Sequence, residues 1–378
     1  MSRQPVRIGI IGGGLMGREL AVVCGRWPQL VDHPVLPRVT AVADPNPAAR
    51  AWFEQISTVE TLTGDWRELV ESPDIDVLYI AVPHDLHEEI YVAAAAAGKD
   101  FLGEKPFGID LEAATRIVAA VDASDSFVRV SSEMPFFPGA LRAYDYAKSG
   151  ALGEIIEVRS QFAHSSDIDR TKPINWKRRV ETCGAIGVMG DLGMHVAHVP
   201  LRLGYAPASV YSMLDSIVET RSGADGLPVA CDTWDNALLA LKAPQPGAAR
   251  IFPMLWETRR IAPGNMNSWS FEALGMDGGV RFTTRNPTVL QRFSRHGNEQ
   301  AWEEIQPGNV SAWPMVSGGI FEFGFADALL QMWASYLAER AGALGDRFAC
   351  ATPAEALGSH RVFEAALRSH ATSAAITL

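Results

Sequence analysis

Three charged or titratable side chains in two short segments could act together on an alcohol. Lys105 follows an apolar run, and Asp191 and His195 stand four residues apart, so a helix would place them on one face. An imidazole titrates near neutral pH and can accept a hydroxyl proton. A lysine can stabilise the charge that develops on the oxygen. We therefore expect Lys105, Asp191 and His195 to be catalytic in an oxidation at a carbon that bears a hydroxyl group.

Each of these side chains also has a simpler interpretation. A single histidine is more often a hydrogen-bonded core residue, and Lys105 could be a surface cation paired with Glu104. His198, three residues after His195, is expected to bind substrate or support the site rather than transfer a proton. Asp191, His195 and His198 could suggest zinc, but no cysteine or distant ligand has a suitable spacing. We expect no metal.

A glycine-rich segment near the N-terminus is typical of a dinucleotide site. It follows a strand-like run at residues 6–11 and opens a helix-like run at residues 15–24. There the first glycine allows a tight turn, the third brings the backbone close to a diphosphate, and the last lets helix and strand pack closely. The positive end of the helix attracts the diphosphate. A plain tight turn is the alternative. The residues expected to hold the cofactor are Gly12, Gly13, Gly14, Leu15, Met16 and Gly17.

An acidic residue, Asp44, ends the next strand-like run at residues 39–43. A carboxylate there would accept hydrogen bonds from the adenosine ribose hydroxyls and repel a 2′-phosphate. This favours NAD over NADP. Two features weaken the preference: Asp44 could instead cap the backbone near Asn46, and Arg50 could tolerate a phosphate, so NADP stays possible.

The N-terminal third alternates strand-like and helix-like segments, which predicts a parallel, doubly wound sheet. Ligands bind beyond the carboxyl ends of such strands, so Lys105 should face the nicotinamide. The strand-like runs are residues 6–11, 39–43, 77–82, 101–102 and 127–131, and the helix-like runs are 15–24, 48–55, 66–70, 88–97 and 111–123.

From about residue 132 strands follow one another with few helices, which predicts a largely antiparallel sheet. We expect an α/β protein with a dinucleotide-binding Rossmann domain at residues 1–131 and an α+β substrate domain with a large open sheet at residues 132–378. The expected strands are residues 155–162, 210–218, 233–242, 249–256, 268–274 and 279–284, and the expected helices are 140–149, 188–203, 325–340 and 353–369.

The composition excludes several classes of protein. The chain has 378 residues and a net charge of −11, so no basic surface for nucleic acid is expected. Four scattered cysteines form no zinc spacing and indicate free thiols in a reducing compartment. No span of about 18 apolar residues is present, so no membrane helix is expected. The first apolar run leads directly into the glycines rather than to a cleavage site. We expect a cytoplasmic protein.

Together these segments resemble the glucose–fructose oxidoreductase/inositol dehydrogenase family (Gfo/Idh/MocA). That family has an N-terminal dinucleotide motif, a Glu-Lys-Pro segment and an Asp-x-Gly-x-His type helix in a second domain. The resemblance here spans nearly the whole chain. Its matching segments are the glycines at 12–17, Asp44, residues 83–87, residues 104–106, residues 150–155, residues 191–195 and the closing helix.

The resemblance adds residues and partners to the expected site. It implies that Pro83, His87 and Glu104 contact the cofactor, with His87 near the nicotinamide, and that Trp176 and Lys177 lie on a loop over cofactor and substrate. It also implies a homodimer or homotetramer formed through the open sheet. The sequence departs from the family at two positions: Glu133 stands where many members carry arginine, and His198 where many carry aspartate. Both are expected in the substrate pocket.

The sequence thus predicts an NAD-dependent dehydrogenase that acts on a secondary hydroxyl of a sugar, cyclitol or related polyol. Two alternatives remain open. An NAD-dependent glycosidase uses related domains and a transient oxidation, but its relatives usually lack the lysine of the Glu-Lys-Pro segment. A non-catalytic sensor that binds NAD or a sugar on this scaffold would tend to lose the catalytic residues, which this chain keeps.

Overall fold

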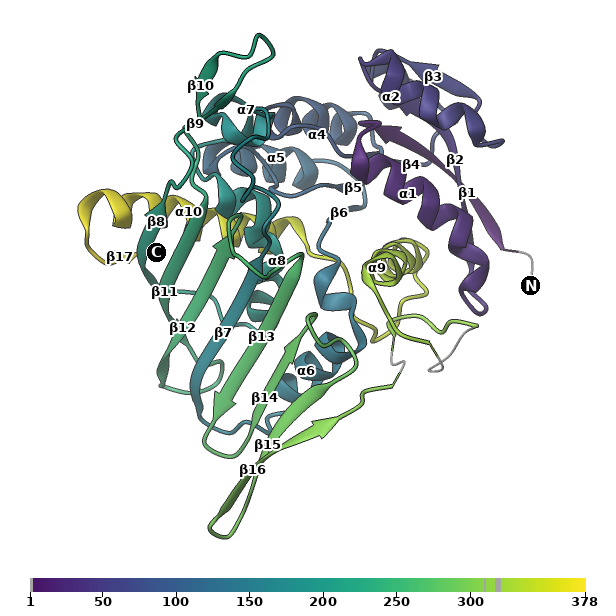
Figure 1. The fold of residues 1–378 in the computed structure, drawn as a ribbon. Helices are drawn as coiled ribbons and strands as arrows, with labels where there is room; N and C mark the ends of the chain where they lie inside the picture. The colour runs from purple at the N-terminus through teal and green to yellow at the C-terminus, as the bar shows by residue number, and fades with distance from the viewer. Residues whose placement is uncertain (1–2, 309–310, 317–320) are drawn as a thin grey trace.

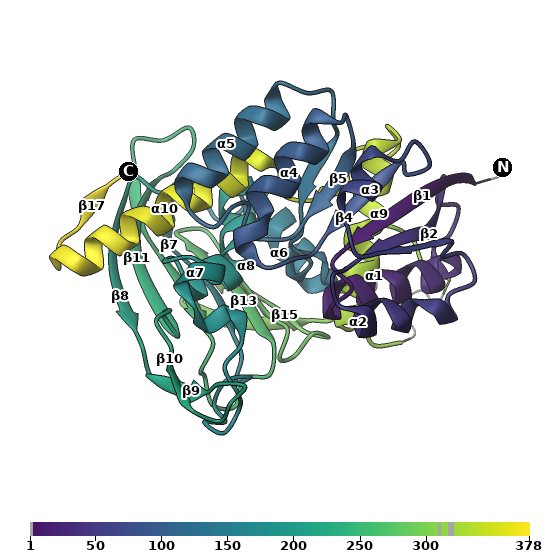
Figure 2. The same ribbon diagram turned by 90° about the horizontal axis from the view of Figure 1, so that it is seen from above.

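The computed structural model describes residues 3–308, 311–316 and 321–378. Its N-terminal part contains a six-stranded parallel sheet in the order β3-β2-β1-β4-β5-β6 (Figures 1 and 2). The apolar runs of the central strands are buried on both faces, as a parallel sheet requires. The strands are β1 (Gln4–Ile11), β2 (Val35–Ala43), β3 (Thr61–Thr63), β4 (Val77–Ile80), β5 (Asp100–Gly103) and β6 (Val128–Val130).

The strand order reverses direction between β1 and β4, so the carboxyl ends of these two strands flank a crevice where ligands bind in such sheets. Right-handed crossovers place α1 and α4 on opposite faces. The N-terminal helical segments are α1 (Leu15–Arg26), η1 (Trp27–Gln29), α2 (Pro47–Ala51), η2 (Trp52–Gln55), α3 (Arg67–Glu71), η3 (His84–Leu86), α4 (His87–Ala96) and α5 (Leu111–Asp122).

The C-terminal part is built on a nine-stranded sheet in the order β16-β15-β14-β13-β7-β12-β11-β8-β17 (Figure 1). Its pairs are antiparallel except for β7 and β12, which run parallel. The strands are β7 (Ile155–Ala163), β8 (Ser209–Asp215), β11 (Asn236–Pro244), β12 (Ile251–Arg259), β13 (Ser268–Gly275), β14 (Gly279–Thr283), β15 (Leu290–His296), β16 (Glu299–Ile305) and β17 (Ile376–Thr377), and a separate hairpin joins β9 (Thr220–Ser222) to β10 (Pro228–Ala230).

Helices cover one face of the nine-stranded sheet. α8 packs on β7 and β12, α10 packs on β8, and α6 packs on β14. Buried and exposed residues alternate along β8 and β12, so the opposite face is open. The remaining helical segments are η4 (Met134–Phe136), α6 (Pro138–Lys148), η5 (Trp176–Arg178), α7 (Val180–Cys183), α8 (Val188–Arg202), α9 (Phe325–Arg340) and α10 (Pro353–Thr372).

The expected fold class is confirmed, with strands that the sequence analysis missed. The hairpin of β15 and β16 extends the sheet, but its residues are mostly polar and half-exposed, so no apolar alternation marks them. The short strands β9, β10 and β17 also escaped prediction because each has only two or three residues. In each case pairing with a neighbour, rather than apolar burial, defines the strand.

Helix α9 lies far along the chain yet packs beside α1 of the N-terminal part (Figure 1). Glu339 forms an ion pair with Arg129, and Arg340 forms one with Asp100 at 2.6 Å. The expected division at residues 131 and 132 therefore follows chain order, whereas α9 is attached to the first sheet. No helix among the described residues is long and apolar enough to cross a membrane.

Candidate active site

A cavity of about 1220 Å³ is lined by residues from both parts of the molecule. The N-terminal part contributes the glycine segment and the ends of β2, β4 and β5. The C-terminal part contributes residues from β7, from the loop that carries η5, and from α8. The expected residues that line the cavity are Gly12, Gly14, Leu15, Met16, Asp44, Pro83, Glu104, Lys105, Trp176, Lys177, Asp191 and His195.

The glycine segment has the geometry that a diphosphate requires. Gly12 has a φ of +106°, and a Cβ there would lie 2.2 Å from the carbonyl oxygen of Ala81. A Cβ at Gly17 would lie 2.2 Å from the carbonyl oxygen of Gly12, so this glycine allows helix and strand to meet. Gly14 is the N-cap of α1, without a side-chain cap, and a Cβ there would enter open space. Free backbone N–H groups at this helix end therefore face the cavity and fit an anionic group.

Asp44 holds the glycine turn in place. One carboxylate oxygen accepts a hydrogen bond from the N–H of Gly13 at 2.8 Å, and the other accepts one from the N–H of Asn46, also at 2.8 Å. Arg50 donates to the main-chain oxygen of Asp44 and not to its carboxylate. Because a carboxylate offers about four acceptor positions, these two contacts leave Asp44 able to bind ribose hydroxyls. Asp44 therefore caps the backbone at Asn46, as one interpretation expected, and can still bind a cofactor.

Lys105 and Asp191 meet across the two parts of the molecule. Lys105 follows β5 and precedes a cis bond to Pro106. Its Nζ lies 2.6 Å from the main-chain oxygen of Asp191 and 3.1 Å from Oδ1. Burial lowers the pKa of Lys105, but the negative charges of Asp191 and Glu104 outweigh it and raise that pKa above its ordinary value. Lys105 is therefore an ammonium in the cavity wall.

Three cations surround the carboxylate of Asp191, which is only 2% exposed. Besides Lys105, the Nζ of Lys177 lies 2.9 and 3.1 Å from its two oxygens, and Arg260 lies 3.6 Å from Oδ2. Burial would raise the pKa of Asp191, but Lys177, Lys105 and Arg260 hold it well below its ordinary value. Asp191 is thus a permanent carboxylate that positions two lysines, and its oxygens bind cations rather than the ring of His195.

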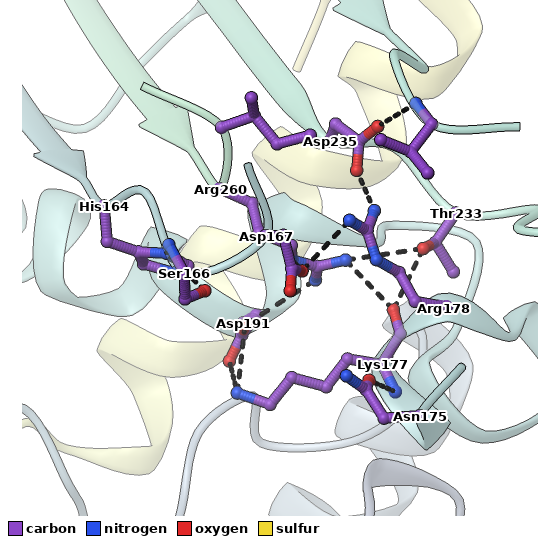
Figure 3. Close-up of polar contacts among 12 residues, drawn as sticks. His164, Ser166, Asp167, Asn175, Lys177, Arg178, Asp191, Thr233, Asp235 and Arg260 are labelled. Atoms are coloured by element: carbon purple, nitrogen blue, oxygen red, sulfur yellow. Dashed lines mark hydrogen bonds and ion pairs between the residues drawn. The ribbon is translucent and has the colours of Figure 1, made fainter. Parts of the chain in front are cut away.

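Behind Asp191 lies a buried ionic network that the sequence analysis did not find (Figure 3). Arg178, which is 0% exposed, pairs with Asp235 and lies 3.0 Å from Asp167. Arg260 donates to the main-chain oxygen of Lys177 at 3.0 Å and lies 3.8 Å from Asp167. The network joins residues that are up to 93 positions apart, from 167 to 260, so only folding reveals it. It fixes the loop that carries Lys177.

His195 presents a neutral imidazole to the cavity. Its ring packs edge-on against Phe162 at 4.9 Å, and its main-chain oxygen accepts a hydrogen bond from Trp269 Nε1 at 2.7 Å. Burial, and then the charge of Lys105, lower the pKa of His195 well below its ordinary value. A neutral imidazole can accept a proton. The carboxyl group of Glu133 lines the same cavity, with Oε2 at 3.8 Å from Nδ1 of His195.

Two histidines expected at the site lie elsewhere. His87 is buried against the main-chain oxygens of Pro106, at 2.7 Å, and Val82, at 3.0 Å, and does not line the cavity. His198 packs on Phe348 at 5.1 Å and is also absent from the cavity lining. Neither ring lines the cavity, so the structure does not support direct contact of His87 with the cofactor or of His198 with the substrate: His87 is held by main-chain oxygens, and His198 faces Phe348.

His84 takes the place expected for His87. It lines the cavity, its Nδ1–H donates to the main-chain oxygen of Cys183 at 3.0 Å, and its ring meets Trp176 edge-on at 4.7 Å. His164 is a second histidine that sequence reasoning missed. Its Nδ1 accepts from the N–H of Ser166 at 3.3 Å, so its proton lies on Nε2. The sequence marked His84 only as part of residues 83–87, one of the segments that resemble the family.

The remaining expected residues have supporting positions. Glu104 accepts a hydrogen bond from the hydroxyl of Tyr79 at 2.7 Å, and its main-chain oxygen accepts one from the hydroxyl of Tyr91 at 2.7 Å. Glu104 therefore anchors the strand end that carries Lys105. Within the described residues, no group of three or more His, Cys, Asp or Glu has a geometry that could hold a metal ion. The absence of a metal remains a prediction.

Comparison with known proteins defines the class. Residues 6–132 match the family model described as "Oxidoreductase family, NAD-binding Rossmann fold", and residues 140–281 match the GFO/IDH/MocA C-terminal domain. Together these matches cover most of the chain, and the chain belongs to the Gfo/Idh/MocA family of oxidoreductases. The resemblance seen in the sequence, the expected fold class and the NAD-binding Rossmann domain are thereby confirmed.

Individual relatives share less than a third of their aligned residues with this chain. The chain is 27% identical to levoglucosan dehydrogenase of Pseudarthrobacter phenanthrenivorans over 338 residues. This aligned region covers 84% of this chain and 85% of the relative. It is 28% identical over 191 residues to trans-1,2-dihydrobenzene-1,2-diol dehydrogenase of Mus musculus. That alignment covers 50% of this chain and 54% of the relative. A structure of levoglucosan dehydrogenase with NADH and L-sorbose matches with a TM-score of 0.87 at 24% identity and covers 99% of both chains. An inositol dehydrogenase homologue from Azotobacter vinelandii in complex with NAD+ matches with a TM-score of 0.77 at 21% identity, covering 99% and 98%.

Proposed function

We propose that this chain is an NAD-dependent dehydrogenase that oxidises a secondary hydroxyl of a sugar, cyclitol or related polyol. One observation carries the proposal: Lys105 from the first sheet and Asp191 and His195 from α8 meet in a single cavity that continues to the glycine segment. The family supplies the reaction class, and the convergence of these three side chains supplies the means of activating an alcohol.

The cofactor would be held by the glycine segment and the strand ends beside it. Main-chain groups of Gly12 and Gly14, with Leu15 and Met16, would contact the diphosphate, and Asp44 would bind the ribose. Gly13 was expected to contact the cofactor, but it does not line the cavity and its N–H donates to Asp44. Gly17 supports the turn without lining the cavity. When bound, NAD supplies a nicotinamide ring that accepts a hydride. Arg50, which donates to the main-chain oxygen of Asp44, would be the group that accommodates the 2′-phosphate of NADP.

Each polar residue of the cavity would have a distinct task. Lys105, held as an ammonium by Asp191, binds the reacting oxygen and stabilises its developing charge. His195, neutral because it is buried, accepts the proton of the hydroxyl group. Lys177 and Trp176 close one side of the cavity. His164 offers an N–H donor to a substrate oxygen, which suits a ligand with several hydroxyl groups.

The named substrates of the relatives support this substrate class. Levoglucosan is an anhydrosugar, and a dihydrobenzenediol carries two neighbouring hydroxyl groups. Both present a secondary alcohol on a ring, next to another oxygen. The aromatic side chains Phe162 and Trp176 that line this cavity suit the C–H face of such a ring.

We further propose that the protein works in the cytoplasm and forms a homodimer or homotetramer through the open face of the nine-stranded sheet. The scattered free cysteines fit a reducing compartment. Tyr211, Met213 and Ile251 point from that open face and are 42%, 60% and 60% exposed. Light scattering should give a mass of at least twice 41.0 kDa; a monomer would refute the assembly.

A panel of sugars, anhydrosugars, cyclitols and cyclic diols, each with NAD and with NADP, tests the activity by absorbance of the reduced cofactor. We expect turnover of at least one ring polyol, faster with NAD. Net hydrolysis of a glycoside without accumulation of NADH would favour the redox-assisted glycosidase. Binding of NAD without turnover across the panel would favour a sensor and refute the dehydrogenase.

A further inference from the structure

The carboxylate of Asp191 contacts Lys105, Lys177 and Arg260, and among the described residues it makes no hydrogen bond to the ring of His195. His195 still needs a partner. Among the described residues its Nδ1 is buried without a hydrogen-bond partner, which leaves Nε2 as the nitrogen open to the cavity. A general base of this kind is oriented by a third group on its far nitrogen. The acid at hand is Glu133.

We propose that Glu133 is the positioning residue for His195: its carboxylate accepts a hydrogen bond from Nδ1–H, so that the lone pair of Nε2 faces the substrate hydroxyl. Glu133 Oε2 lies 3.8 Å from Nδ1, which is ion-pair distance. Such contacts are often long before substrate binds and shorten in the reacting complex. The inference rests on the proposed dehydrogenase activity and assigns a role to a residue that the Lys-Asp-His constellation leaves out.

The local fold holds Glu133 against His195. Glu133 follows β6 and immediately precedes the short helical segment η4, and α8 packs against η4. The side chains of Glu133 and His195 are 7% and 3% exposed, so water competes little for their contact. Within the described part of the chain, the carboxyl group of Glu133 has two donors within reach: its own main-chain N–H and Nδ1 of His195.

Several charged and titratable groups surround the pair. Glu133 faces Glu104 and Lys105 at the end of β5 and Tyr79 of β4, and His195 faces Lys105, Asp191, His198 and Lys177. Burial and the charge of Glu104 raise the pKa of Glu133 to about 7, against the opposing effect of Lys105. Above that pH Glu133 is a carboxylate, and a buried carboxylate on the far nitrogen can stabilise an imidazolium as it forms.

The step balances within the proposed reaction. The O–H bond of the substrate breaks as its proton bonds to Nε2 of His195, while Nδ1–H stays hydrogen-bonded to Glu133. The hydrogen on the same carbon leaves with its electron pair to the nicotinamide ring of NAD, and a carbonyl forms. Glu133 itself does not touch the reacting atoms.

The test compares Glu133→Gln and Glu133→Ala with Ser132→Ala. Ser132 is a buried neighbour whose hydroxyl has no hydrogen-bond partner among the described residues, so its loss should leave turnover unchanged. For Glu133→Gln we expect kcat to fall about 10- to 100-fold with KM within about threefold. The acidic limb of the kcat profile should move to lower pH, because glutamine cannot be protonated there and His195 loses a negative neighbour.

A second readout needs neither cofactor nor substrate. Nitrogen NMR of 15N-histidine-labelled protein should show His195 with its proton on Nδ1 in the wild type, and loss of that preference in Glu133→Ala. Turnover within threefold of wild type with an unmoved acidic limb, or a wild-type proton on Nε2, would overturn the proposal. If the wild type turns over no polyol, the dehydrogenase proposal fails instead, and the NMR result alone decides the role of Glu133.

Discussion

Replacing Lys105 by methionine separates its two roles, binding the reacting oxygen and pairing with Asp191. Methionine keeps most of the length and removes the charge. Asp191 would still contact Lys177 at 2.9 Å and Arg260 at 3.6 Å, so it would not become an unpaired buried charge. We therefore expect the folded state to lose only about 1–3 kcal/mol, the value of charge-assisted hydrogen bonds.

The loss of activity should be larger than the loss of stability suggests. A donor aimed at a developing oxyanion contributes about 10²–10³-fold to kcat, or roughly 3–4 kcal/mol. We expect that loss in Lys105→Met, measured as initial rates of NADH formation with a saturating polyol. Binding of NAD, followed by calorimetry, should stay within about threefold of wild type, because the ammonium of Lys105 donates to Asp191 and not to the glycine turn.

Lys177→Met is the matched control. Lys177 contacts the same carboxylate twice, at 2.9 and 3.1 Å, but its side chain is 39% exposed. If Lys105 served only to neutralise Asp191, both variants would lose activity equally. We expect Lys177→Met to retain at least ten times more activity than Lys105→Met. Equal losses, or turnover of Lys105→Met within tenfold of wild type, would refute the assignment of Lys105 as the group that binds the reacting oxygen.

Three further outcomes test the glycine turn, the buried network and an ion pair. The Cβ of Gly14→Ala would meet open space, so this variant should keep its stability within about 1 kcal/mol yet bind NAD at least tenfold more weakly. The Cβ of Gly12→Ala would lie 2.2 Å from a carbonyl oxygen, so this variant should lose both stability and NAD binding. Urea unfolding measures the stability and calorimetry measures the binding. Asp235→Asn should cost about 3–5 kcal/mol in urea unfolding, because it removes a partner of the fully buried Arg178; a loss below 1 kcal/mol would contradict the network. Glu355 forms an ion pair with Arg202 at 2.5 Å. Burial raises the pKa of Glu355, but the hydrogen bonds and charge of Arg202 outweigh burial and lower that pKa from 4.5 to about 2. The pair therefore contributes about 3 kcal/mol of stability above pH 4.5, which is lost as pH falls toward 2. The stability difference between wild type and Glu355→Gln should therefore shrink over that range, and a constant difference would contradict it.

Sequence patterns alone were enough for the fold class because they reflect local rules. The apolar run at residues 6–11, the glycines that follow it and the acidic end of the next strand each depend on a few neighbouring residues. The helix that carries Asp191 and His195 is likewise one continuous segment, Val188–Arg202, and it ends within one residue of its expected bounds. Residues that belong to such local units can be placed from their sequence neighbours.

Residues that depend on the orientation of a side chain could not be placed in the same way. His84 and His87 are three residues apart, and only the η3 turn puts the first in the cavity and the second against main-chain oxygens. His198 shares a helix with His195 but faces Phe348. Glu133 was expected in the substrate pocket, yet its approach to His195 depends on how η4 packs on α8.

The sequence by itself determined the dinucleotide-binding half, the helix that presents Asp191 and His195, and the lysine at the end of the fifth strand, because glycine conformations, apolar periodicity and strand ends are local properties. Only the tertiary structure decided that three cations enclose Asp191 while a separate glutamate approaches His195. Those partners lie far apart in the chain, and a carboxylate finds its cation by burial and distance, which no spacing in the sequence encodes.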